Sequence, residues 1–225
     1  MTTAGNMLML SGGKNGWTNP YIINGLVAMW DGEWNAGGGI HDSTATTWVD
    51  LSGSGHDIPL TGGSFGDNYL SVSGLAGSTS AITGDIMTIE YVGISTKKSI
   101  VQGVMQIQKS GGYYTRHIVY RANNTLNFGA SGPCFVVDPT VRLYAAEAFA
   151  SASGVDGTLY KNGLITSSQG AGAYVSGSNT EMKVGNVGGY TFYGEINRIA
   201  IYSRGLTAAE IAANYAVDKA RFGLP

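Results

Sequence analysis

Residues 25–31, which read GLVAMWD, are the stretch that decides the fold class. In an extended chain, successive side chains point to opposite faces, so Leu26 and Trp30 lie on one face and Val27 and Met29 on the other. Both faces are apolar, which is typical of a strand that is covered on both sides. The sequence therefore predicts a strand in the interior of a β-rich protein.

The same kind of pattern continues outward from this stretch. Short apolar alternations are broken by Gly, Asn, Asp and Ser about every 8–12 residues, which indicates an antiparallel sandwich. Asn-Asn at residues 123–124 and Asn-Gly at residues 162–163 are two-residue hairpin turns. The predicted strands are Gly25–Trp30, Ile86–Ile94, Ile100–Gln108, Arg116–Tyr120, Thr125–Phe128, Arg142–Ala150, Thr158–Lys161, Glu181–Val184 and Glu195–Tyr202.

One helix is predicted, over residues 207–222. Thr207 and Glu210 have the spacing of a capping box, in which each side chain bonds the backbone amide of the other residue. Gly223 is placed to end the helix. We expect the chain to have two parts. Residues 1–24 form a polar arm that mediates attachment or oligomer contacts through Trp17, and residues 25–225 form the sandwich domain, which includes the helix.

Three segments, in the same order along the chain, resemble a known superfamily. Residues 25–31 with residues 47–57 (TWVDLSGSGHD) are similar to its opening strand and W-x-D-x-S-G-x-G-x-D turn. Residues 159–163 (LYKNG) are similar to its L-Y-x-N-G hairpin, and residues 193–211 to its closing strand, R-x-L-S/T turn and short helix. The chain thus resembles the laminin-G-like domains of the concanavalin A-like lectin/glucanase superfamily, of the type found in bacteriophage, prophage and bacterial surface proteins. The resemblance implies an all-β, two-sheet antiparallel jelly-roll sandwich with one short C-terminal helix.

Composition limits the partners of the chain. Charged residues make up 12% of it, with a net charge of −2 and no basic run, so a nucleic-acid partner is not expected. The apolar stretches are strand-length, which argues against membrane insertion. The N-terminus lacks the basic region of a signal peptide. We interpret the lone Cys134 as a small residue of the core.

Carboxylate placement argues against catalysis. Family members that hydrolyse glycans carry two glutamates and an aspartate at alternate positions on one strand, and this chain has no such string. Glu90, Glu147 and Glu181 each stand alone, and Asp31 with Glu33 is the closest pair. The prediction is therefore that the protein is not an enzyme, with a glycoside hydrolase as the remaining alternative.

Aromatic residues beside glycines suggest where a sugar could bind. Sugar C–H faces pack on aromatic rings, and hydroxyls bond neighbouring polar groups. The predicted ligand-binding residues are Trp34, Asn35, Tyr113, Tyr114 and Tyr190. The alternative is that these side chains pack on their own sheet or on a neighbouring subunit.

Calcium is a possible cofactor, because many relatives bind this ion at the rim of a sheet. Asp31, Asp50 and Asp57 are the candidate ligands, although Ca²⁺ takes six to eight oxygens and one loop cannot supply them. The alternative is that these aspartates bond local amides as Asx turns.

The leading functional hypothesis is a non-catalytic recognition or adhesion domain that binds a glycan or cell-surface polysaccharide. The resemblance implies display on a phage virion, as capsid decoration or a tail-associated part, after synthesis in the host cytoplasm without a signal peptide. An extracellular surface, as part of a larger protein, is the alternative location. Other virion proteins and further copies of the chain are expected partners. The rival hypothesis is a structural virion component that binds no sugar.

Overall fold

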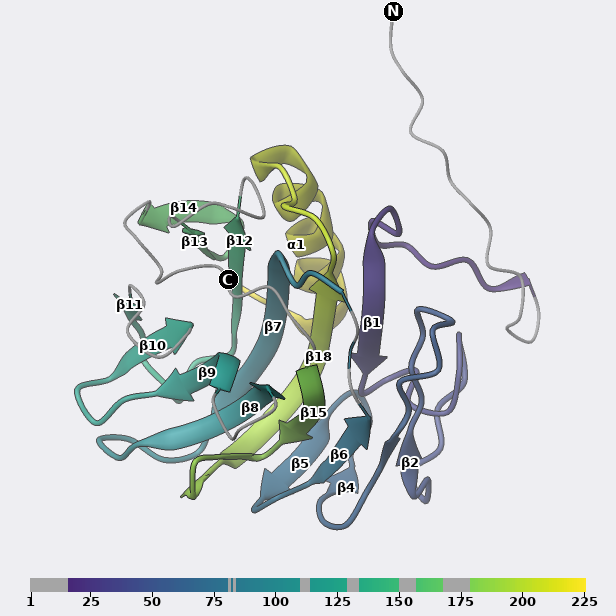
Figure 1. Ribbon diagram of the computed structural model, residues 1–225, viewed down its shortest axis with the longest axis horizontal. Coiled ribbons are helices and arrows are strands. Elements are labelled where there is room, and N and C mark those ends of the chain that lie inside the picture. Colours follow the sequence, from purple (N-terminus) through teal and green to yellow (C-terminus); the bar gives the residue numbers. More distant parts are fainter. Residues whose placement is uncertain are drawn as a thin grey trace, which may run out of the picture.

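The protein is an antiparallel β-sandwich with one helix at its C-terminal end (Figure 1). The computed structural model describes residues 16–80, 82, 84–109, 114–128, 134–149, 157–167 and 179–225. No helix in this part of the chain is both long and apolar enough to cross a membrane. The predicted all-β sandwich class is confirmed.

The larger sheet has β18, the longest strand of the described residues, near its centre. Its order is β14 (Leu164–Ser167), β13 (Gly157–Lys161), β12 (Leu143–Phe149), β7 (Thr88–Ser95), β18 (Tyr193–Tyr202), β5 (Leu70–Ser73) and β4 (Ser64–Phe65). β1 (Leu26–Asp31) pairs with the C-terminal half of β18, and β5 pairs with its N-terminal half. The stretch that decided the fold class is thus joined to the last strand of the chain.

The smaller sheet packs against the larger one. Its order is β11 (Cys134–Val136), β10 (Thr125–Phe128), β9 (Tyr114–Tyr120), β8 (Gln102–Lys109), β15 (Asn179–Val184) and β6 (Gly77–Ser80). Figure 1 shows β10, β9, β8, β15 and β6 following one another from left to right. Two short ribbons complete the strands, β2 (Thr47–Trp48) with β3 (Ile58–Pro59) and β16 (Asn186–Val187) with β17 (Tyr190–Thr191).

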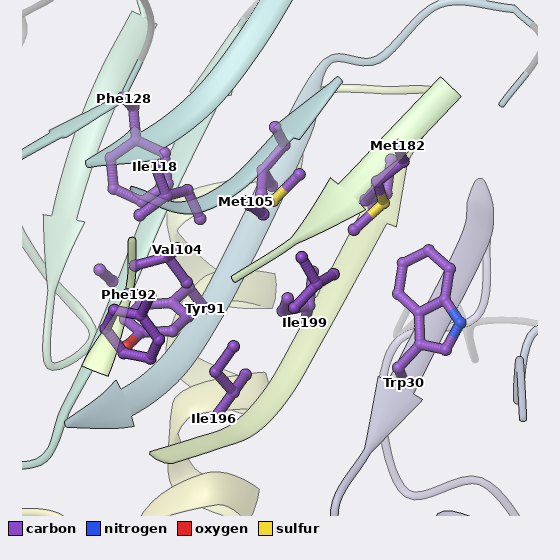
Figure 2. Packing of buried hydrophobic residues seen from close by; sticks show 14 of the residues in the cluster. Trp30, Tyr91, Val104, Met105, Ile118, Phe128, Met182, Phe192, Ile196 and Ile199 are labelled. Carbon is purple, nitrogen blue, oxygen red and sulfur yellow. The ribbon is translucent and has the colours of Figure 1, made fainter. Parts of the chain in front are cut away.

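The main hydrophobic core lies between the two sheets (Figure 2). Alternate side chains of the central strands enter it, as the period of a pleated strand requires, except where a β-bulge interrupts the alternation. Tyr91 and Ile199 of the larger sheet lie in one cluster with Met105, Ile118 and Met182 of the smaller sheet, all of them buried. This alternation fixes which side chains of each sheet point outward.

A second apolar cluster lies on the other face of the larger sheet, beneath α1 (Ala208–Phe222). Ile211 and Phe222 of the helix pack there with Tyr144 and Tyr202 of the sheet. Because α1 covers this face, the central strands of the larger sheet are buried on both sides, as residues 25–31 predicted.

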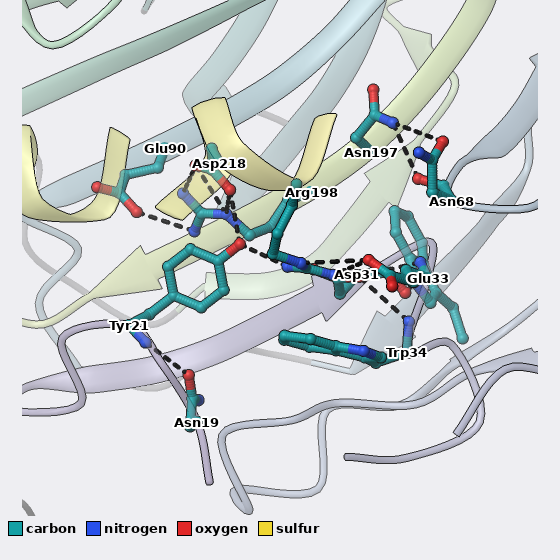
Figure 3. A network of polar contacts seen from close by, with 12 residues as sticks. Asn19, Tyr21, Asp31, Glu33, Trp34, Asn68, Glu90, Asn197, Arg198 and Asp218 are labelled. Carbon is teal, nitrogen blue, oxygen red and sulfur yellow. Dashed lines mark hydrogen bonds and ion pairs between the residues drawn. The ribbon is translucent and has the colours of Figure 1, made fainter. Parts of the chain in front are cut away.

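A charged network is buried within this second cluster (Figure 3). Arg198 of β18 donates from Nη1 to Glu90 Oε2 at 2.9 Å and from Nη2 to Asp218 Oδ2 at 2.5 Å. Tyr144 and Asn214 donate to Glu90 as well, and Tyr21 donates to Asp218. A buried ion is tolerated when it is paired and hydrogen-bonded in this way, so the network ties α1 to the sheet in one position.

The local predictions correspond closely to the structure. All nine predicted strands are present, with bounds that differ by a few residues at most. Thr207 and Glu210 form the capping box, and Gly223 ends the helix at φ 65°. Asn124, Asn162 and Gly163 have the positive φ that their turns require.

Two predictions about side-chain faces were wrong. A β-bulge between Leu26 and Ala28 places Leu26 on the face of Met29 and Val27 on the face of Trp30, the reverse of strict alternation.

Cys134 was expected in the core, but it is exposed on β11, the edge strand of the smaller sheet. Its neighbour Phe135 occupies the core instead. The sequence alone did not show which face of its strand Cys134 lies on. Because successive side chains alternate between faces and Phe135 points into the core, Cys134 points outward.

Residues 16–24, assigned from the sequence to the arm, lie against the sandwich. Tyr21 is buried in the cluster beneath α1, and Ile22 packs beside it. Trp17 packs edge to face on Trp34, with ring centroids 5.1 Å apart. Residues 1–15 lie outside the described residues, so the attachment role of the arm stays a prediction.

Candidate functional site

The Trp34 ring packs on Arg221 of the C-terminal helix and on Trp17. The Arg221 guanidinium of α1 lies 3.5 Å from the centroid of the ring, and Trp17 packs on it as well. Arg221 also donates to Asp31 and Glu33 (Figure 3 shows these two carboxylates beside Trp34). Trp34 is therefore part of the contact between its loop and the C-terminal helix.

Asn35 also has a structural role. Its side chain is completely buried, and its Nδ2 donates to the Asp42 carbonyl at 2.7 Å. The Asp42 amide donates back to Asn35 Oδ1 at 2.9 Å. Both ends of the amide thus close the loop on itself, and these contacts leave none of the Asn35 surface for a ligand.

The other predicted aromatic residues have different settings. Tyr113 lies outside the described residues, and so does the side chain of Tyr114, which begins β9. Their ligand role stays a prediction. Tyr190 of β17 is 51% exposed, so its ring remains accessible from solvent.

The hairpin that carries Tyr190 lies on the outer face of the smaller sheet. Its Gly188 amide donates to Gln106 Oε1 at 3.0 Å, and Gln106 points away from the core. A Cβ added at Gly103 of β8 would collide with Val187 of β16, so glycine is required where the hairpin meets the sheet. The β16–β17 hairpin therefore forms a border on this face, with an exposed tyrosine on it.

Beside this hairpin, polar side chains meet across neighbouring strands. Lys183 of β15 pairs with Gln106 of β8, and Gln106 pairs with His117 of β9. One step along the strands, Glu181 pairs with Gln108. These five residues are here called the polar row. Directly opposed side chains on one face lie about 4.5–5.5 Å apart at Cβ, so the row runs continuously across these strands. Gln106 and His117 are buried, at 4% and 5% exposure, and Gln108, Glu181 and Lys183 are its partly exposed members.

The charges of the polar row are balanced. Lys183 Nζ lies 3.0 Å from Glu181 Oε2, and the two side chains are 32% and 34% exposed. Gln106 and Gln108 contribute amides, and His117 contributes an imidazole. The row therefore combines hydrogen-bonding groups with a local charge near zero.

The sequence analysis missed the polar row, although each strand carried a signal. Residues 106–108 and 181–183 each have polar side chains at alternate positions. The sequence does not show that β15 pairs with β8, and this pairing brings together residues that are far apart in the chain. No local pattern specifies such a register.

The three candidate calcium ligands have other partners in the structure. Asp50 accepts from the Met29 and Ser52 amides through Oδ1, and from Ser52 Oγ and the His56 amide through Oδ2. Asp57 accepts from the Asp50 amide, and Asp31 is paired with Arg221. Within the described ranges, no three His, Cys, Asp or Glu side chains are grouped to hold a metal ion. Asp50 forms an Asx turn with Ser52, and Asp57 bonds the Asp50 amide across the loop. The calcium role of these residues stays a prediction.

The carboxylates considered for catalysis have structural roles or lie apart. Glu90 is bound to Arg198, and Asp31 and Glu33 are bound to Arg221. Glu147 of β12 is 1% exposed, and burial raises its pKa to about 7, although the charge of Arg116 lowers it. These positions fit a non-catalytic domain.

Comparison of the sequence with family models and with curated proteins finds no match. Among solved structures, a Trypanosoma rangeli sialidase in complex with sialic acid is similar at a TM-score of 0.64 and 13% identity, over 92% of this chain and 35% of that chain. A structure described as the HCR/D W1238A mutant is similar at a TM-score of 0.61 and 12% identity, over 88% and 53%. The chain thus spans about a third of the length of the sialidase. These likenesses concern the fold, which is consistent with a concanavalin A-like, jelly-roll type sandwich.

Proposed function

We propose that this protein is a non-catalytic carbohydrate-binding domain whose ligand lies on the outer face of the smaller sheet, along the polar row and against the β16–β17 hairpin. The observation that carries the proposal is the combination of the partly exposed members of the polar row, Gln108, Glu181 and Lys183, with the exposed Tyr190 on the hairpin that is bonded to Gln106. Sugars are recognised by this pairing of an aromatic face with convergent polar groups.

The hairpin supplies the aromatic part of the site on a fixed support. The Gly188 amide bond to Gln106 and the contact of Val187 with Gly103 hold β16 on β8. Tyr190 pairs with Val187 across the hairpin, so its backbone is positioned by the same contacts. A ring on a rigid support loses little conformational freedom when a ligand binds.

The location of the protein is a separate part of the proposal. We propose display on a phage virion, with the sandwich presenting its polar row to a cell-surface polysaccharide and with other virion proteins and further copies as partners. The charge-poor, glycine-rich composition supports this setting. One edge of the sandwich also exposes apolar side chains, with Val136 of β11 72% exposed and Leu164 of β14 73% exposed, which is compatible with contacts to other chains.

A glycan array of the intact protein tests the binding function. We expect selective retention of one family of glycans, and a loss of about tenfold or more in Tyr190→Ala and Gln108→Ala. Leu164→Ala is the matched control, because it removes an exposed side chain from the other sheet. Retention of no glycan, with a folded protein, would support the purely structural alternative.

A further inference from the structure

The charge balance of the polar row limits the class of sugar that it can take. Lys183 is the one Lys or Arg among the outward-facing strand side chains described on this sheet, and Glu181 already pairs with it. Arg116 points to the opposite side, because it pairs with the core residue Ile107. Among the side chains that the structure describes, the face therefore presents no excess positive charge to a ligand.

The segments that link the strands of this sheet to the next strands carry few cations in their sequence. Residues 110–113 (SGGY) and 129–133 (GASGP) link β8 to β9 and β10 to β11, and residues 168–178 (SQGAGAYVSGS) link β14 of the larger sheet to β15. These three segments contain neither Lys nor Arg. Lys109 is the last residue of β8, and Arg121 follows β9 in the turn to β10. Both stand at the ends of strands and outside the polar row.

Anionic sugars would bind poorly on such a surface. Removing a carboxylate or sulfate from water is costly unless a cation or several charged hydrogen bonds replace the water. Glu181 would repel such a group directly, and Lys183 could satisfy it only by giving up its present partner. Hydroxyl groups, by contrast, both donate and accept, and the partly exposed Gln108 amide has the same two functions.

We infer that the ligand is a neutral glycan, an inference that rests on the proposed carbohydrate-binding function. Selectivity for uncharged over charged sugars follows from the Glu181–Lys183 pair, which keeps the row neutral. The pair determines specificity because an anionic sugar would meet the Glu181 carboxylate, and this unfavourable contact discriminates against it.

Matched glycan pairs test the inference on the intact protein. An array presents neutral oligosaccharides beside their sialylated and sulfated forms, for example lactose beside sialyllactose and sulfated lactose. We expect the neutral member of a bound pair to be retained about tenfold more strongly. Binding of that member should change little between about 0.05 and 0.5 M NaCl, because no net charge is neutralised.

The Glu181→Gln variant provides the second arm. It removes the carboxylate that neutralises Lys183, so the signal of the sialylated or sulfated member should rise several-fold relative to the neutral one. Thermal unfolding of the variant establishes that it is folded. Preference of the unmodified protein for the charged members, or unchanged selectivity in the folded variant, overturns the inference but leaves the carbohydrate-binding function intact. Retention of no glycan overturns the proposed function itself.

Discussion

Arg198 and Asp218 form a bidentate ion pair between the central strand of the larger sheet and the C-terminal helix. Arg198 Nε lies 2.9 Å from Asp218 Oδ1, and Nη2 lies 2.5 Å from Oδ2. Both side chains are completely buried. The helix is therefore held to the sheet by apolar packing and also by a charge pair that has one geometry.

Asp218→Asn should destabilise the protein strongly, because it leaves Arg198 with one fewer counter-charge in the interior. We expect a loss of about 3 kcal/mol or more in the free energy of unfolding, measured by urea titration. Lys98→Ala is the control, since it breaks the exposed pair with Asp138 and should leave the unfolding midpoint nearly unchanged. A similarly small effect in Asp218→Asn would show that the network adds little to stability.

Glu147 should make stability depend on pH in an unusual direction. Burial raises its pKa to about 7, from an ordinary value of 4.5. Between these values the folded state binds more protons than the unfolded state, so the free energy of unfolding falls as pH rises through this window. Urea titrations at pH 5 and pH 7.5 measure the fall. The Glu147→Gln variant should show a smaller fall in the free energy of unfolding, whereas the control Glu181→Gln, at a partly exposed carboxylate, should show the same fall as the unmodified protein. Equal falls in all three proteins would contradict the account.

Trp34→Ala separates a structural from a binding role for this residue. Loss of the contacts with Arg221 and Trp17 should reduce the free energy of unfolding by about 2 kcal/mol or more. Affinity for the glycan should be unchanged below the unfolding transition. If the variant keeps its free energy of unfolding but loses affinity for the glycan, Trp34 is a ligand-binding residue instead.

The sequence predicted the elements of the fold better than the site. Strands and turns are local, so alternation and turn residues such as Asn162 and Gly163 were sufficient. Trp34 was interpreted from its glycine-rich surroundings, but Arg221 reaches it from the opposite end of the chain. Contacts of this kind depend on tertiary packing and have no local pattern.

The polar row was hidden for a related reason. Gln106 and Lys183 become neighbours only when β15 pairs with β8. Tyr190 could be predicted because exposure beside two glycines is a local property, and the structure confirms that it is exposed. Its position beside the row depends on the Gly188 bond to Gln106, which again joins distant residues.

The most direct test is an NMR titration of the uniformly ¹⁵N-labelled protein with a neutral glycan selected on the array. The account predicts that the largest amide shift changes cluster at residues 106–108, 117, 181–183 and 188–190, with a dissociation constant that Tyr190→Ala weakens by about tenfold or more. Shift changes confined to the loop of Trp34, or to the face covered by α1, would contradict the placement of the site on the smaller sheet.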